Sequence, residues 1–169
     1  MIQKKVCMVG VHGTGKTSLV QRFVHSLFSE RYLSTVGVKI DRKPLEVDGT
    51  ALTLVLWDLA GRDGLEDITT SYLRGAHAIL YVADGTRKET CDQIPELRAL
   101  AREAAGEVPE LVALNKTDLT DRWALGKGDE EALAGGWEMV RTSAKTGAGV
   151  EEAFQRLGRA LLVAKEARS

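Results

Sequence analysis

A glycine-rich segment between an apolar run and a helical pattern constrains the fold of this chain most strongly. Residues 6–9 form the apolar run, and the segment GVHGTGKT, residues 10–17, follows it directly. Apolar residues at helical spacing then continue over residues 17–27. A strand, a glycine loop and a helix in this order are typical of α/β units that bind an anion at the N-terminus of the helix.

Short β-rich runs alternate with helical patterns along the rest of the chain. Strands are predicted at residues 37–47, 51–58, 76–84, 110–116 and 136–144, the last of which has the weakest pattern. Helices are predicted at residues 90–105, at 121–134 and from 149 onward. Pro95 leaves the start of the first of these helices open, and two glycines weaken the pattern of the second.

The connections between these elements predict the kind of sheet. Asp48-Gly49 separates two strand patterns and predicts a hairpin, which adds one antiparallel strand. Strands that are joined through helices are expected to be parallel. We therefore predict an α/β fold of one domain, residues 1–169, with a mostly parallel sheet and helices on both faces.

Composition narrows the function classes. The chain has 169 residues, 44% of them hydrophobic, which suits one domain with a full core. Its formal net charge of −1 predicts no general attraction to nucleic acid or to an anionic membrane. Cys7 and Cys91 are too few for a disulfide framework and fit a cytoplasmic location.

No apolar run approaches the roughly 20 residues that span a bilayer. The final residues, VAKEARS, contain no cysteine, so we expect no covalent membrane anchor there. Nothing demands more than a monomer.

The glycine loop matches the phosphate-binding pattern G-x-x-x-x-G-K-[ST]. The small residues Gly13, Thr14 and Gly15 allow successive N–H groups to curl around a phosphate. Lys16 would reach the β- and γ-phosphates, and the Thr17 hydroxyl would coordinate Mg²⁺. A plain glycine-rich turn with a nearby lysine is the alternative, and the strand–loop–helix context favours phosphate.

Two further segments indicate a guanine base. Asp118, in the segment NKTD after the strand at 110–116, can accept hydrogen bonds from guanine N1–H and the 2-amino group. Adenine would leave that buried charge unpaired. In the segment TSAK, residues 142–145, the Ala144 N–H can donate to guanine O6. Lys116 and Lys145 offer aliphatic stems to the ring faces. Taken alone, NKTD could be an ordinary strand-to-helix turn.

Asp58 and Thr35 are candidates for sensing the γ-phosphate. Asp58 ends the strand at 51–58, where it can hold Mg²⁺ through water, and the Gly61 N–H can point at the γ-phosphate. The Thr35 hydroxyl is a candidate second Mg²⁺ ligand, although a solvated loop threonine is the better explanation of that residue taken alone. Loss of the γ-phosphate would release both loops, which is the behaviour of a switch.

With these motifs in order, the chain resembles the Ras-like small GTPases, and STVGVKI and WDLAG look closest to the Rab branch. The family fold has a six-stranded sheet, which agrees with the six strands predicted above, and five helices, one more than the four predicted above. The resemblance implies GTP and GDP binding with Mg²⁺ and hydrolysis of GTP. It also implies that Asn115 and Ser143 line the nucleotide site. Ser18 would support the α-phosphate, Phe28 would pack edge-on against guanine, and Tyr32 would close over the nucleotide.

The resemblance further implies two switch segments, residues 28–38 and 59–74, that meet effector, exchange-factor and activating proteins. Two departures bear on the reaction. Arg62 stands where the family usually has a glutamine that orients the attacking water, and a guanidinium accepts no hydrogen bond. Arg62 could instead stabilise charge on the γ-phosphoryl oxygens, or be a solvated surface residue. His12 stands where many relatives have a small residue and could crowd the γ-phosphate.

We therefore predict a switch that hydrolyses GTP slowly, with Lys16, Thr35, Gly61 and Arg62 as the candidate catalytic residues. A GTP-binding scaffold with negligible hydrolysis is the alternative. A P-loop nucleotide kinase is disfavoured, because the chain has no lid insertion over the phosphates and NKTD has no role in that chemistry.

Overall fold

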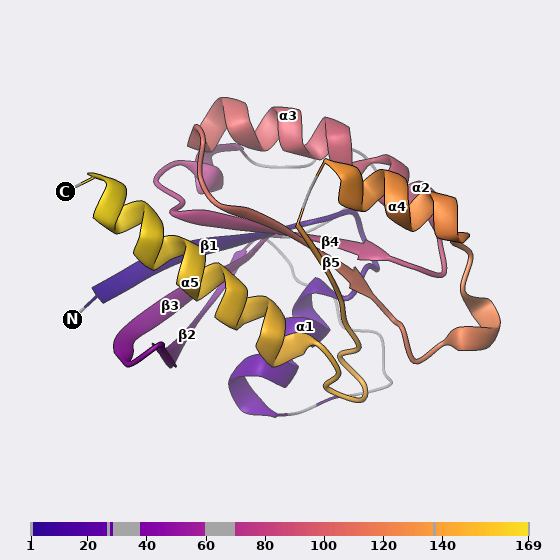
Figure 1. The fold of residues 1–169 in the computed structure, drawn as a ribbon, viewed down its shortest axis with the longest axis horizontal. Coiled ribbons are helices and arrows are strands. Elements are labelled where there is room, and N and C mark those ends of the chain that lie inside the picture. The colour runs from indigo at the N-terminus through magenta and orange to yellow at the C-terminus, as the bar shows by residue number, and fades with distance from the viewer. Residues whose placement is uncertain (1, 27, 29–37, 60–69, 137, 169) are drawn as a thin grey trace.

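The computed structural model describes residues 2–26, 28, 38–59, 70–136 and 138–168 (Figure 1). The strands are β1 (Ile2–Val9), β2 (Val38–Val47), β3 (Thr50–Leu59), β4 (Ala78–Asp84), β5 (Glu110–Asn115) and β6 (Met139–Arg141). The α-helices are α1 (Lys16–His25), α2 (Lys88–Asp92), α3 (Ile94–Ala105), α4 (Lys127–Gly135) and α5 (Val150–Arg168). Two short 3₁₀ helices, η2 (Thr70–Leu73) and η3 (Thr120–Arg122), complete the description.

The strands form one six-stranded sheet in the order β2-β3-β1-β4-β5-β6. β2 pairs with β3 in antiparallel register, and every other neighbouring pair is parallel. The turn between β2 and β3 has positive φ at both Asp48 and Gly49, as a tight two-residue hairpin turn requires. The predicted fold class, including the single antiparallel strand, is confirmed.

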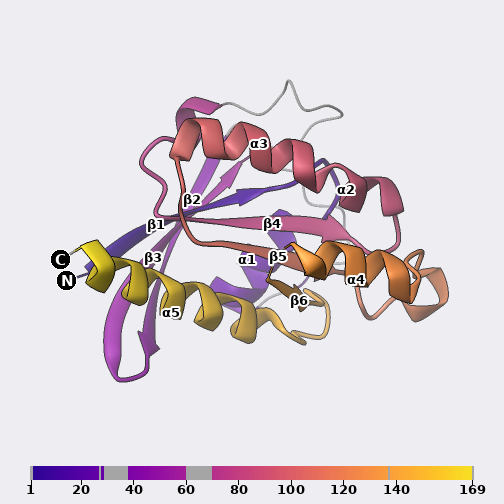
Figure 2. The same ribbon diagram turned by 45° about the horizontal axis from the view of Figure 1, so that its top comes forward.

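Helices cover both faces of the sheet, and the strands divide their side chains between them. In β1, Val6 and Met8 join the core under α1 and α5, whereas Cys7 and Val9 join the core under α3. The same alternation runs through β4 and β5, as expected for strands buried on both sides. Figure 2 shows α3 on one side of the sheet and α5 on the other.

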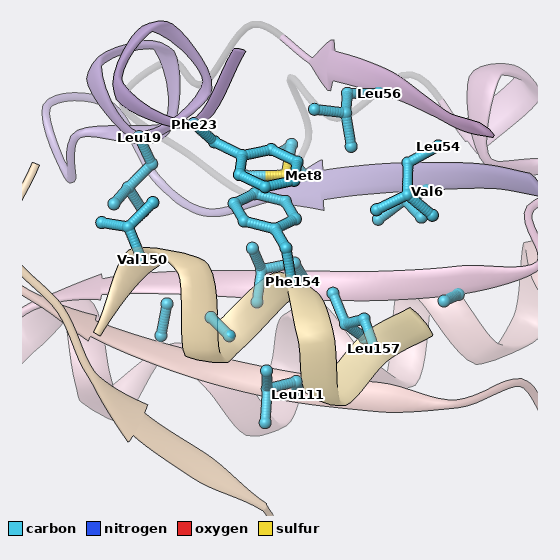
Figure 3. Packing of buried hydrophobic residues seen from close by; sticks show 14 of the residues in the cluster. Val6, Met8, Leu19, Phe23, Leu54, Leu56, Leu111, Val150, Phe154 and Leu157 are labelled. Carbon is cyan, nitrogen blue, oxygen red and sulfur yellow. The ribbon is translucent and has the colours of Figure 1, made fainter. Parts of the chain in front are cut away.

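Two stacked aromatic rings hold α1 against α5. Phe23 and Phe154 lie with ring centroids 3.9 Å apart and an interplanar angle of 7°, beside Met8 of β1 (Figure 3). The predicted apolar stripe of α5 is buried here, since Val150, Phe154 and Leu157 all belong to this core. Because α1 begins with Lys16, this packing also fixes where the glycine loop lies.

Several predicted boundaries were wrong in detail, among them the strand predicted at 136–144, of which β6 takes only Met139–Arg141. The helix predicted at residues 90–105 is two helices that meet at Gln93, because Pro95 fits the first turn of α3, where its missing N–H costs nothing. The helix predicted at 121–134 begins only at Lys127, where the Gly126 N–H donates to the Asp129 carboxylate at 2.9 Å. β1 begins at Ile2 rather than residue 6, because its less buried first half also pairs with β3.

None of the helices in the described part of the chain combines the length and the apolar character that a membrane crossing requires.

Candidate nucleotide-binding site

The predicted site residues gather at the carboxyl edge of the sheet. The glycine loop follows β1, Asp58 lies at the end of β3, and Asn115 ends β5. The segment 142–145 follows β6. Since the carboxyl ends of parallel strands meet at one edge, segments far apart in the sequence become neighbours there.

Two glycines of the loop are required by close packing. Gly15 has a φ of 99°, and a Cβ at this position would lie 2.3 Å from the Asn115 Nδ2. A Cβ at Gly10 would lie 2.4 Å from the Val82 carbonyl oxygen of β4. The loop backbone therefore lies directly against β4 and β5, and a larger residue at either position would push it away from the sheet.

Lys16 is buried and folds back over the loop. Its Nζ donates to the Gly10 carbonyl at 2.9 Å and to the Val11 carbonyl at 3.4 Å. Burial lowers the pKa of Lys16 to about 8, although the nearby Asp58 carboxylate opposes this shift. The side chain thus keeps a cation above the loop, where a phosphate would meet it.

Thr17 and Asp58 are in contact, as a shared metal site requires. The Thr17 Oγ1 donates to the Asp58 Oδ2 at 2.6 Å, and Asp58 is fully buried. A hydroxyl and a carboxylate are hard oxygen ligands that suit Mg²⁺, which usually takes one or two protein ligands together with substrate phosphates. Among the described residues, no group of three His, Cys, Asp or Glu side chains could hold a metal ion.

Asn115 joins the glycine loop to the end of β6. Its Nδ2 donates to the Thr14 carbonyl at 3.0 Å, and its Oδ1 accepts from the Thr142 hydroxyl at 3.1 Å. All three residues are buried. Asn115 therefore connects the loop proposed for the phosphates with the strand that leads to residues 143–145.

Lys116 connects the glycine loop to the carboxylate at the end of β4. Its Nζ donates to the Gly13 carbonyl at 2.9 Å and pairs with the Asp84 carboxylate at 2.9 Å. Asp84 also pairs with Arg87 at 3.1 Å, and the Arg87 Nη2 donates to the His12 carbonyl at 2.9 Å. The glycine loop is thus held on its outer side by two cations that share one carboxylate.

Asp84 was not predicted from the sequence. It ends β4, is almost fully buried, and accepts hydrogen bonds from the Thr86 N–H at 2.8 Å and the Thr86 Oγ1 at 2.6 Å. Burial alone would raise its pKa, but hydrogen bonds from Thr86 and Lys116 outweigh burial, and the pKa lies below its usual value. A lone carboxylate at the end of the apolar run AHAILYVAD was the signal that could have identified it.

Asp118 is held in place by Ser143. The Ser143 Oγ donates to the Asp118 Oδ1 at 2.7 Å, and the Thr146 N–H donates to the Ser143 Oγ at 3.1 Å. Ser143 and Ala144 are buried, whereas Lys145 is exposed. The two segments proposed to recognise the base are therefore in direct contact.

The remaining predicted residues lie at the edges of this site or outside the described residues. Ser18 lies in the first turn of α1, and Phe28 is 36% exposed beyond the end of that helix. Thr35, Gly61 and Arg62 fall outside the described residues, as does Tyr32. Their predicted roles in catalysis, metal binding and nucleotide closure are not tested by the structure.

The fold and the arrangement of these motifs define a small GTP-binding protein that acts as a molecular switch. Comparison with known proteins agrees, because the family model described as "Ras family" matches residues 5–163. The chain belongs to the Ras family.

Its relatives include proteins of the Rab branch, so the predicted resemblance is confirmed. It is 37% identical over 161 residues to "Ras-related protein Rab-1" of Theileria annulata, and the alignment covers 93% of this chain and 73% of that protein. It is 35% identical over 161 residues to "Ras-related protein Rab-8B" of Homo sapiens, and the alignment covers 94% of this chain and 78% of that protein.

Proposed function

We propose that this chain, as one domain, binds GTP and GDP together with Mg²⁺ at the site above and hydrolyses GTP slowly. The observation that carries the proposal is the Asn115 amide, which bonds the Thr14 carbonyl at 3.0 Å and the Thr142 hydroxyl at 3.1 Å. It joins the glycine loop to the end of the strand that leads to Ser143, on one edge of the sheet.

On this proposal, the backbone amides at Gly13, Thr14 and Gly15 surround the phosphates at the N-terminus of α1. Lys16 moves its Nζ from the Gly10 and Val11 carbonyls to the phosphate oxygens, which replace neutral acceptors by charged ones. Thr17 and Asp58 would hold Mg²⁺, which neutralises charge on the phosphate oxygens when bound.

The base would be selected by two different groups. The Asp118 carboxylate, oriented by Ser143, accepts from guanine N1–H and the 2-amino group. The Ala144 N–H donates to the 6-oxo group, while the stems of Lys116 and Lys145 cover the ring. Adenine presents an acceptor and no 2-amino group to Asp118, so it leaves this partly buried carboxylate without either donor.

Slow hydrolysis follows from Arg62, which replaces the residue type that orients water in the family. We expect a single-turnover rate with GTP and Mg²⁺ below the intrinsic rate of Ras, which is on the order of 10⁻⁴ s⁻¹. Arg62→Gln should raise that rate. A faster wild-type rate that falls in Arg62→Ala would replace this view with an arginine that acts in cis. A rate indistinguishable from that of buffer would support the alternative, a GTP-binding scaffold.

Partner proteins would read the nucleotide state at a surface formed by the two switch segments and the adjoining strand β2. Ile40 of β2 is 44% exposed and Tyr72 of η2 is 37% exposed, and the Tyr72 ring lies 6.3 Å from the ring of Trp57 on β3. Exposed apolar and aromatic side chains of this kind are typical of docking sites. Ile40→Asp should weaken any interaction that distinguishes the GTP form from the GDP form. The affinity for GDP should remain unchanged.

A further inference from the structure

Arg22 reaches from α1 to the loop that follows β6. Its Nε donates to the Ala144 carbonyl at 2.7 Å, across 122 residues of chain, and its Nη2 donates to the Lys145 carbonyl. The stem of Arg22 lies beside Gly147, whose position would place a Cβ 3.8 Å from the Arg22 Cδ. Nothing in the sequence motifs marks this arginine as part of the site.

The guanidinium is suited to hold two successive carbonyls. Its N–H groups form a planar fork, so both bonds can be made from one side-chain position. Because the donor is a cation, both bonds are charge-assisted. A lysine at the same position would be a single point charge.

Fixing these carbonyls also fixes the amides beside them. The peptide bond is planar and trans, so the carbonyl of one residue and the N–H of the next point in opposite directions. With the Ala144 and Lys145 carbonyls turned toward Arg22, the Lys145 and Thr146 amides turn away from it. The Thr146 N–H accordingly donates to the Ser143 Oγ at 3.1 Å.

The backbone groups of Ser143, at the start of the same loop, are held without Arg22. The Ser143 N–H donates to the Ala148 carbonyl at 2.9 Å, and the Gly147 N–H donates to the Ser143 carbonyl at 2.8 Å. Asp118 takes its hydrogen bond from the Ser143 side chain. The Asp118 carboxylate and the Ala144 carbonyl therefore take their hydrogen bonds from different donors, Ser143 and Arg22.

We propose that Arg22 is a positioning residue for recognition of the guanine 6-oxo group. By holding the Ala144 carbonyl, it fixes the backbone of the residue whose own N–H would donate to O6, and by holding the Lys145 carbonyl it fixes the peptide that follows. Because Arg22 belongs to the helix that begins at Lys16, it also ties the base loop to the phosphate loop. This inference rests on the proposed function, since it assumes that the ligand is a guanine nucleotide.

The test compares three nucleotides that differ at single positions of the base. GDP carries both groups, IDP lacks the 2-amino group that Asp118 would read, and 6-thio-GDP replaces O6 by a weaker acceptor. Dissociation constants are measured by competition against a fluorescent GDP for wild type, Arg22→Ala and Arg22→Lys. The matched control is Arg159→Ala, which removes an arginine that pairs with Asp48 at 3.0 Å between α5 and the hairpin turn.

Arg22→Ala should weaken GDP binding about 10- to 100-fold, because the loop loses two charge-assisted hydrogen bonds that hold its backbone. The ratio of the dissociation constant of 6-thio-GDP to that of GDP should fall toward one. The ratio of the dissociation constant of IDP to that of GDP should keep its wild-type value. Arg22→Lys should be intermediate in both quantities. Arg159→Ala should bind all three nucleotides as wild type does.

The outcomes separate the inference from the function on which it rests. If wild type binds none of the three nucleotides, the proposed function and the inference fall together. If wild type discriminates as expected but Arg22→Ala keeps the full preference over 6-thio-GDP, the inference alone is wrong. An equal loss of both preferences would mean that Arg22 only stabilises the loop. Should Arg22→Ala not fold, Arg22→Lys, which keeps the stem and the charge, decides by the same two ratios.

Discussion

Replacing Asn115 by alanine should disconnect the phosphate loop from the base loop. The amide of Asn115 is almost fully buried and makes bonds to the Thr14 carbonyl at 3.0 Å and from the Thr142 hydroxyl at 3.1 Å. Asn115→Ala removes both bonds and leaves two buried polar groups without this partner. Each such loss costs about 1–3 kcal/mol, so we expect about 2–6 kcal/mol in the free energy of unfolding.

For a chain of this length, 1 kcal/mol corresponds to about 2–4 °C in melting temperature, so the variant should melt roughly 10 °C below wild type. Thermal unfolding without nucleotide measures this change. A second assay follows the dissociation of a fluorescent GDP. We expect release to accelerate at least about tenfold, because the glycine loop loses its bond to β5.

Two matched variants divide the effect between the bonds. Asn115→Asp keeps an acceptor for the Thr142 hydroxyl but places a carboxylate oxygen against the Thr14 carbonyl, where the donor was. Thr142→Val removes only the other bond. Asn115→Asp should therefore release GDP quickly, whereas Thr142→Val should lower the melting temperature with little change in release. Equal release rates in these two variants, or wild-type release in Asn115→Ala, would refute the reasoning.

Three further changes test other parts of the site. Gly15→Ala should abolish measurable nucleotide binding, because alanine at φ 99° is strained and its Cβ would lie 2.3 Å from Asn115 Nδ2; titration with GDP checks this. Asp84 has a folded-state pKa below its unfolded value, which is about 3.9, so it stabilises the fold above that pH and loses the contribution as pH falls through the folded-state pKa. Asp84→Asn should therefore be less stable at neutral pH and lose less stability below about pH 4 in acid unfolding curves. Asp118→Asn should bind xanthosine diphosphate better than GDP, because an amide N–H can donate to the 2-oxo group. Competition binding checks this, and a variant that still prefers GDP would contradict it.

Local signals in the sequence predicted most of the fold and the positions of its motifs. Asp48-Gly49 predicted the hairpin because a tight turn needs positive φ at both positions, which these residues tolerate. The glycine-loop motif predicted the strand before it and the helix after it, since the motif occurs between these two elements. Helix boundaries were less certain, and the break at Gln93 depended on where Pro95 could be accommodated in α3.

The supporting contacts of the site could not be read in the same way. Asp84 at the end of β4 holds Lys116 after β5, and Arg22 holds carbonyls 122 and 123 residues away. Such pairs depend on the order of strands in the sheet, which no local pattern encodes. The sequence therefore predicts the residues that would touch the ligand more readily than those that hold them in place.

Calorimetric titration of the nucleotide-free chain with GTP and with ATP, each with Mg²⁺, tests the central claim most directly. We expect GTP to bind and ATP to bind at least about a thousandfold more weakly, because adenine leaves the Asp118 carboxylate unsatisfied. Equal affinities, or no binding of either nucleotide, would contradict the account.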